Sequence, residues 1–256
     1  MPLQPLHAPA RVERRHTRLR LDLEDGGATS LHVAAFELSE VVPRVRVLPA
    51  SMPLASWCRI SAVTDAIVGG FFVRSQNVPL GELRIDGARV DSVPFERPWD
   101  GVRSCVHVVG RTARLAPRSE IRADPPGDLL QAGPLLVRGG EVVLADRDPE
   151  GFSTGAAQFD SDITVGRYPR AALGIVGSTL LAAVCEGRAP DEVGLTLAEL
   201  SRAMRTLGAE VAINLDGGGS ASLVVDGRLV NRPREEHGID IVGGRPIATA
   251  ISFERV

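Results

Sequence analysis

The chain has 256 residues, of which 44% are hydrophobic, enough for one large domain with a substantial core. Its net charge is −3, so we expect no nucleic-acid partner, and all 29 of its basic residues are arginines. Without lysine, a Walker-type phosphate loop and Schiff-base chemistry are excluded, and any cation in a functional site must be an arginine.

The first 16 residues predict a loose lead-in, followed by one domain over residues 17–256. The lead-in carries arginines where a signal peptide would need an apolar segment, so we expect a cytoplasmic protein. No apolar run reaches the about 18 residues of a membrane span, and we therefore predict no membrane partner.

From Thr17 onward, short β-like runs alternate with turn signals. Residues 17–23 and 29–36 flank Asp25-Gly26-Gly27, which predicts a hairpin. Three later segments repeat this pattern around Asp86-Gly87, Gly139-Gly140 and Asp226-Gly227.

Two segments predict helices. Residues 51–64 give a weak signal, whereas residues 196–207 combine a capping box, Thr196 with Glu199, and an apolar stripe, and Gly208 follows as a stop. We therefore predict an α+β fold: a single hairpin-rich domain with a mixed sheet, and one prominent helix before the strand that ends at Asp-Gly-Gly-Gly-Ser.

The most informative segment is residues 211–233. An apolar run ends at Asn214 and Asp216, and Gly217–Gly219 and Ser220 follow. Glycines let a ligand approach the main chain, and successive N–H groups can bind an anion. Asp216 would act there as nucleophile, base or hydrogen-bond acceptor, and Ser220 would bind phosphate; the alternative is an aspartate that only caps its own turn.

The chain resembles the phosphodiester glycosidase family over roughly residues 60–253, because several of the family's sequence blocks occur in order. These blocks are Gly69–Phe72 with Pro79–Gly81, Ala132–Val137, Tyr168–Gly174, Thr196–Leu200, Leu207–Ala209, Asn214–Ser220, Val230–Pro233 and Arg245–Ala248. Two positions depart from the family pattern: Val68 replaces an asparagine and Ala171 replaces a threonine.

The resemblance implies which residues form the site. It brings Arg170 and Arg245 to the glycine turn as phosphate-binding groups, with Asp216 and Asn214 as catalytic residues. It also places Gly69 and Gly70 beside the substrate. Glu82 is a candidate second carboxylate and His237 a candidate lid residue or acid, although both have the alternative of being exposed and solvated, and each arginine has the alternative of a surface ion pair.

The resemblance further implies a function. We predict a hydrolase that cleaves a glycosyl-1-phosphodiester into a free sugar and a phosphomonoester, with a small-molecule sugar phosphate as its partner. The alternatives are a glycosyl or phosphoglycosyl transferase and a catalytically silent sugar-phosphate binding module. No metal-binding motif occurs, so we predict no cofactor, leaving open a divalent metal at Asp216 as well as the oligomeric state.

Overall fold

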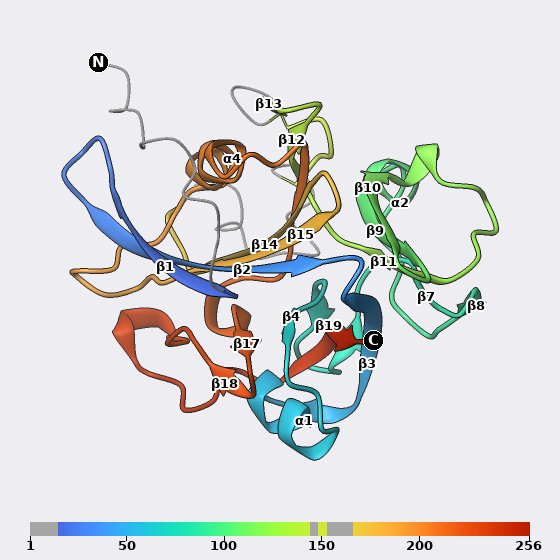
Figure 1. Ribbon diagram of the computed structural model, residues 1–256, viewed down its shortest axis with the longest axis horizontal. Coiled ribbons are helices and arrows are strands. Elements are labelled where there is room, and N and C mark those ends of the chain that lie inside the picture. Colours follow the sequence, from blue (N-terminus) through green and yellow to red (C-terminus); the bar gives the residue numbers. More distant parts are fainter. Residues whose placement is uncertain (1–14, 144–147, 153–165) are drawn as a thin grey trace.

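The computed structural model describes residues 15–143, 148–152 and 166–256 (Figure 1). Strands hold 46% of these residues and helices only 13%. The predicted α+β class with a mixed sheet is therefore wrong: the described part of the protein is mostly β, and every ladder between its named strands is antiparallel.

The largest sheet has seven strands in the order β1-β2-β15-β14-β16-β12-β13. Their bounds are His16–Asp22 (β1), Ala28–Glu37 (β2), Thr179–Cys185 (β15), Arg170–Val176 (β14), Val211–Asn214 (β16), Leu135–Arg138 (β12) and Glu141–Val142 (β13). β1 begins at the last residue of the predicted lead-in, of which residues 1–14 lie outside the described part.

Two five-stranded sheets and one small ribbon complete the scaffold. The first sheet contains β10 (Thr112–Pro117), β9 (Ser104–Val109), β11 (Asp128–Gln131), β7 (Leu83–Ile85) and β8 (Ala88–Arg89). The second contains β18 (Arg228–Leu229), β17 (Leu223–Val225), β4 (Ala66–Val68), β19 (Ile247–Arg255) and β3 (Val41–Met52). The ribbon pairs β5 (Phe72–Val73) with β6 (Val78–Pro79).

The seven-stranded sheet is covered on both faces. Helix α4 (Leu197–Thr206) packs on one face, where Leu200 and Met204 are fully buried, each contributing about 2 kcal/mol of burial. The opposite face forms the central core with the other sheets, and Phe36 of β2 stacks on Phe253 of β19 at 4.0 Å between ring centroids. Figure 1 shows α4 on one side of this sheet and β17, β4 and β19 on the other.

The structure confirms the predictions of four hairpins and two helices. The pairs β1–β2, β7–β8, β12–β13 and β17–β18 form at the predicted turns. α4 begins with the Thr196–Glu199 capping box, and Gly208 follows it with φ +88°. The weak helix signal corresponds to the shorter α1 (Leu54–Ile60), and α2 (Trp99–Val102) and the 3-10 turns η1 (Arg118–Glu120), η2 (Gly218–Ser220) and η3 (Glu236–Gly238) were not predicted.

Candidate functional site

Asp216 lies where two sheets meet. β16 runs between β14 and β12 in the seven-stranded sheet, and its ladder continues as Leu215 N–H donates to Ala171 at 2.9 Å. The next residue leaves this sheet, because Asp216 N–H donates at 3.0 Å to the carbonyl of Gly69, which directly follows β4. Gly69 packs so tightly that a Cβ there would lie 2.4 Å from the hydroxyl of Thr249 on β19.

The Asp216 carboxyl group has an unusual environment for an acid. Burial raises its pKa to about 6, against the smaller opposing effects of the Ser220 hydroxyl, the Gly217 N–H and the charges of Arg245 and Arg74. The Gly217 N–H donates to Oδ1 at 2.9 Å. Although the Ser220 hydroxyl is close enough to affect the pKa, neither Oδ2 of Asp216 nor Oγ of Ser220 completes a hydrogen bond of good geometry with the described residues.

Orphaned polar atoms gather at this turn. Four buried side-chain oxygens on this segment have no hydrogen-bond partner among the described residues: Asn214 Oδ1, Asp216 Oδ2, Ser220 Oγ and Ser222 Oγ. Each such atom costs about 1–3 kcal/mol if it stays unsatisfied. The Asn214 amide is held by its other end, which donates to Gly133 O at 3.0 Å. This concentration of unsatisfied polar atoms makes the turn a candidate functional site.

The glycine turn itself offers fewer N–H groups than the sequence suggested. Gly217 N–H is used by the Asp216 side chain, and Gly218 N–H donates to Pro169 O at 2.8 Å. Glycine is needed for space, since a Cβ at Gly217 would lie 2.9 Å from the same carbonyl, and Gly218 adopts φ +60°. An anion here must therefore be bound mainly by side-chain cations.

Two arginines approach the turn, and one carboxylate binds both. Arg245 N–H donates to Gly219 O at 3.0 Å, and its guanidinium binds Glu235 through Nε at 2.7 Å and through Nη2. Arg188 Nη1 lies 3.3 Å from the same carboxylate. The Arg188 guanidinium is 5.6 Å from the ring centroid of Tyr168 and 3.5 Å from where a Gly218 Cβ would stand.

Two predicted site residues have other partners, and a third is exposed. Arg170 borders the turn with its backbone, but its guanidinium donates to Leu195 O at 3.0 Å and Gly166 O at 2.9 Å. Glu82 lies beside β7, where Arg84 and Arg118 bind its carboxylate at 2.8 and 2.6 Å. His237 is exposed in η3 with φ +61°.

The two departures from the family pattern lie in the core. Val68 and Ala171 are 1% and 0% exposed and belong to the central hydrophobic cluster between the sheets. Their apolar side chains therefore have apolar neighbours.

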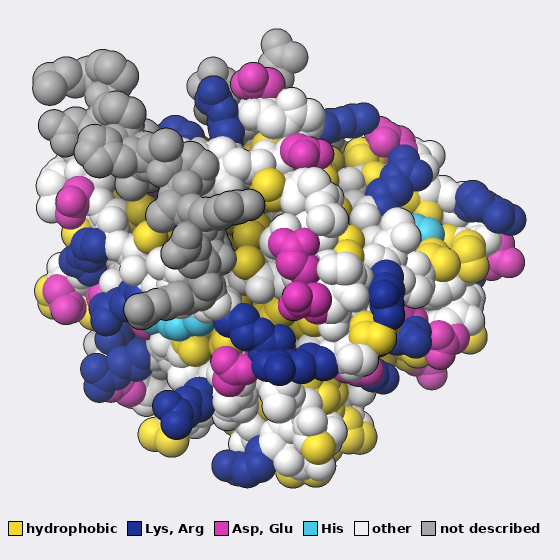
Figure 2. Space-filling view, in the orientation of Figure 1, with side chains coloured by type: hydrophobic (Ala, Val, Ile, Leu, Met, Phe, Trp, Pro, Cys, Tyr) yellow, Lys and Arg dark blue, Asp and Glu magenta, His cyan; other side chains and the backbone are white. Residues whose placement is uncertain are grey.

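The described residues contain no group of three or more metal-ligating side chains, and none of their helices has the length and apolar character of a membrane span. Basic and acidic side chains are interspersed over the face shown in Figure 2. That face thus presents no single sign of charge.

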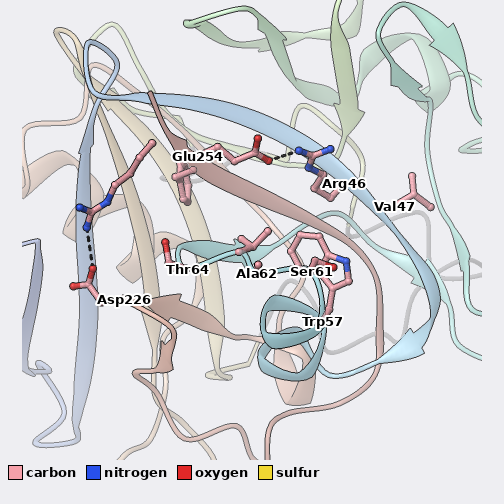
Figure 3. Close-up of a pocket in the computed structure, with 11 residues that line it drawn as sticks. Arg46, Val47, Trp57, Ser61, Ala62, Thr64, Asp226 and Glu254 are labelled. Atoms are coloured by element: carbon pink, nitrogen blue, oxygen red, sulfur yellow. Dashed lines mark hydrogen bonds and ion pairs between the residues drawn. The ribbon is translucent and has the colours of Figure 1, made fainter.

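A separate hollow of about 850 Å³ lies near the Asp226 end of β17, whereas the glycine turn precedes the other end of that strand (Figure 3). Its charged side chains already have partners, as Arg46 pairs with Glu254 and Arg255 with Asp226. We place the candidate site at Asp216, because the unsatisfied polar atoms and a carboxyl group with a raised pKa are there, whereas Glu254 in the hollow has a lowered pKa and is paired with Arg46.

Comparison with known proteins assigns the scaffold to a class. A model of the phosphodiester glycosidase family matches residues 61–254, and the chain therefore belongs to the phosphodiester glycosidase family. No curated protein sequence matches the chain.

Solved structures share the fold at low sequence identity. The zebrafish N-acetylglucosamine-1-phosphodiester alpha-N-acetylglucosaminidase catalytic domain, auto-inhibited by its pro-peptide, has a TM-score of 0.70 and 18% identity over 96% of this chain and 86% of its own. A Synechocystis hypothetical protein has a TM-score of 0.65 and 18% identity, with 92% of this chain and 61% of its own covered. A Burkholderia pseudomallei protein described as exported has a TM-score of 0.62 and 18% identity, with 90% of this chain and 74% of its own covered.

Sequence reasoning missed Arg188 and Glu235. Both reach the turn from loops far from it in sequence, and Glu235 lies only two residues from the His237 that was singled out. Residues 234–238 are polar in sequence, but the sequence does not show which of their side chains binds Arg245 and Arg188.

Proposed function

We propose that the protein hydrolyses a glycosyl-1-phosphodiester to a free sugar and a phosphomonoester. One observation carries the proposal: Asp216 combines a pKa raised to about 6 with an unsatisfied Oδ2, beside Arg245 and the orphaned Ser220 hydroxyl. Family membership supports the same class of reaction.

The charges suit such a substrate. A phosphodiester carries one negative charge, and the guanidinium groups of Arg245 and Arg188 are the cations next to the turn. Asn214 Oδ1 and Ser222 Oγ can accept hydrogen bonds from sugar hydroxyls.

Asp216 supplies the proton transfer. A carboxyl group whose pKa lies near the working pH can both donate and accept a proton in the transition state. The bond that breaks joins the bridging oxygen to either the sugar carbon or the phosphorus. The bond that forms joins the same carbon or phosphorus to the oxygen of water. Water thus contributes OH to one fragment and H to the other.

The test is turnover in oxygen-18 water. The purified protein is incubated with a panel of sugar-1-phosphodiesters, including UDP-N-acetylglucosamine, and the products are followed by mass spectrometry. We expect hydrolysis that Asp216→Asn abolishes and that the matched surface variant Asp226→Asn retains. Label in the sugar shows cleavage of the carbon–oxygen bond, and label in the phosphate shows cleavage at phosphorus.

Other outcomes overturn the proposal. Transfer of the sugar to an added acceptor without hydrolysis would select the transferase. Binding without turnover by the wild type, surviving in Asp216→Asn, would select a silent binding module.

A further inference from the structure

Glu235 occupies the binding face of Arg245. Its carboxylate accepts two hydrogen bonds from that guanidinium and lies 3.3 Å from Arg188 Nη1. Although partial burial opposes ionisation, the bonds from Arg245 and the charges of Arg245, Arg188 and Arg74 hold the pKa of Glu235 below its usual range. A full negative charge therefore already lies where an incoming phosphate would bind.

The fold keeps this carboxylate against the turn. A Cβ at Gly219 would lie 2.9 Å from Glu235 Oε1, so the missing side chain of Gly219 leaves the space that Glu235 uses. The side chains of Arg245 and Arg188 are only 15% and 10% exposed, so water screens their charges less than on an open surface. The charge of each side chain beside these arginines therefore affects which anion binds.

The charges can be counted. Arg245 and Arg188 contribute two positive charges, and Glu235 cancels one of them. Among the described residues, exposed Arg74 adds a third positive charge, which ionised Asp216 offsets. The remaining single positive charge matches a phosphodiester, whereas a phosphomonoester carries up to two negative charges because its second pKa is about 6.

We propose that Glu235 is a specificity-determining residue that restricts this site to singly charged phosphodiesters and rejects doubly charged phosphomonoesters. This inference rests on the proposed function, and it explains how the phosphomonoester product would leave: cleavage adds a negative charge that the site, with Glu235 present, does not neutralise.

The test measures anion binding without turnover. Dimethyl phosphate represents the diester and methyl phosphate the monoester, each titrated into the 256-residue protein at pH about 8, where the monoester is a dianion. We expect Glu235→Gln to tighten methyl phosphate binding by about tenfold and dimethyl phosphate binding by about threefold, since the removed carboxylate repels a dianion twice as strongly as a monoanion.

Two variants control the measurement. Glu236→Gln makes the same chemical change at an exposed neighbour and should leave both affinities unchanged. Glu235→Asp keeps the charge and should retain the wild-type preference, so a general loss of structure is distinguished from loss of the carboxylate.

The inference is overturned if neither probe binds the wild type, if both anions tighten equally in Glu235→Gln, or if methyl phosphate binds no tighter. The outcome is separable from the test of hydrolysis. Discrimination that depends on Glu235 without any turnover would leave a phosphodiester-binding site and remove the hydrolase, whereas turnover with unchanged discrimination would remove only the role of Glu235.

Discussion

Two carboxylates proposed for the same site have opposite surroundings. Burial raises the pKa of Asp216 to about 6, and its Oδ2 has no partner among the described residues. Glu82 is also partly buried, which opposes ionisation, yet hydrogen bonds from Arg118 and Arg84 hold its pKa below the usual range. The Asp216 carboxyl group is thus available for chemistry, whereas the Glu82 carboxylate is fixed in a cluster of ion pairs.

The difference comes from what each fold region supplies. Beside β7 the chain offers three arginines to one carboxylate, including Arg89 at 3.6 Å. At the glycine turn the two nearest arginines are instead bound by Glu235. Placement of arginines, more than burial alone, thus decides which acid remains reactive.

The largest expected effect is on activity, which should fall when Asp216 is changed but not when Glu82 is changed. Asp216→Asn should lower kcat by about 10³-fold, because it removes the proton-transfer group. Glu82→Gln should leave kcat close to wild type. Single-turnover rates on a phosphodiester from the panel test this, and an equal loss in both variants would contradict the comparison.

The next largest effect is on stability, which should fall when Glu82 is changed. Glu82→Gln leaves Arg118 without its charged partner and leaves Arg84 with only the exposed Asp124; the two arginine side chains are 11% and 5% exposed, so the change should lower the free energy of unfolding by about 3 kcal/mol. Denaturant unfolding measures this. The control is Glu120→Gln, which breaks exposed pairs with Arg138 and Arg114 and should have little effect.

The sequence predicts local features well because their causes are local. Asp-Gly turns fix the hairpins, and Thr196 with Glu199 fixes the start of α4. β3 was not predicted; it contains Pro43, which is tolerated because β3 lies at a sheet edge. With β3 and β9–β11 missed, α4 seemed more prominent than it is, and the fold was assigned to α+β.

The site divides in the same way. Asp216, Asn214, Ser220 and the glycines are consecutive in one strand and turn, so one segment of sequence predicts them together. The groups that set their charge environment come from distant loops, and only the folded chain places Glu235 between Arg245 and Arg188.

A smaller effect tests the pH dependence of stability. The pKa of Asp216 is about 6 in the folded state and 3.8 ordinarily, so the folded protein is penalised for ionising it. Below pH about 4 both states are protonated and there is no penalty; the penalty grows up to pH about 6 and then stays constant, at about 3 kcal/mol. Asp216→Asn should therefore be more stable than wild type above pH about 6 and equal to it below about 4.

Glu82 should show the opposite sign. Its lowered pKa stabilises the folded state above its ordinary value of 4.5, and this stabilisation is lost as pH falls through the lowered value. Thermal unfolding of wild type, Asp216→Asn and Glu82→Gln across this range gives the curves. Parallel curves for all three proteins would mean that the two environments do not differ.

The smallest expected effect concerns the space above the turn. In Gly219→Ala the new Cβ would lie 2.9 Å from both Glu235 Oε1 and Ile241 Cδ1, so both side chains must shift. We expect a loss of about 1 kcal/mol of stability and a weaker hold of Glu235 on Arg245. Methyl phosphate binding should then tighten a few-fold, in the same direction as in Glu235→Gln.

Gly101→Ala is the matched control for this change, because its Cβ would meet nothing within 4 Å and it lies in α2. It should leave anion binding unchanged and stability equal or slightly higher, since alanine favours a helix over glycine. If Gly219→Ala binds methyl phosphate as weakly as wild type, the carboxylate has kept its hold on Arg245 after moving. In that case the turn supplies space for Glu235 but does not determine where its charge lies. The difference between the pKa values of Asp216 and Glu82 would then depend on the placement of the arginines alone.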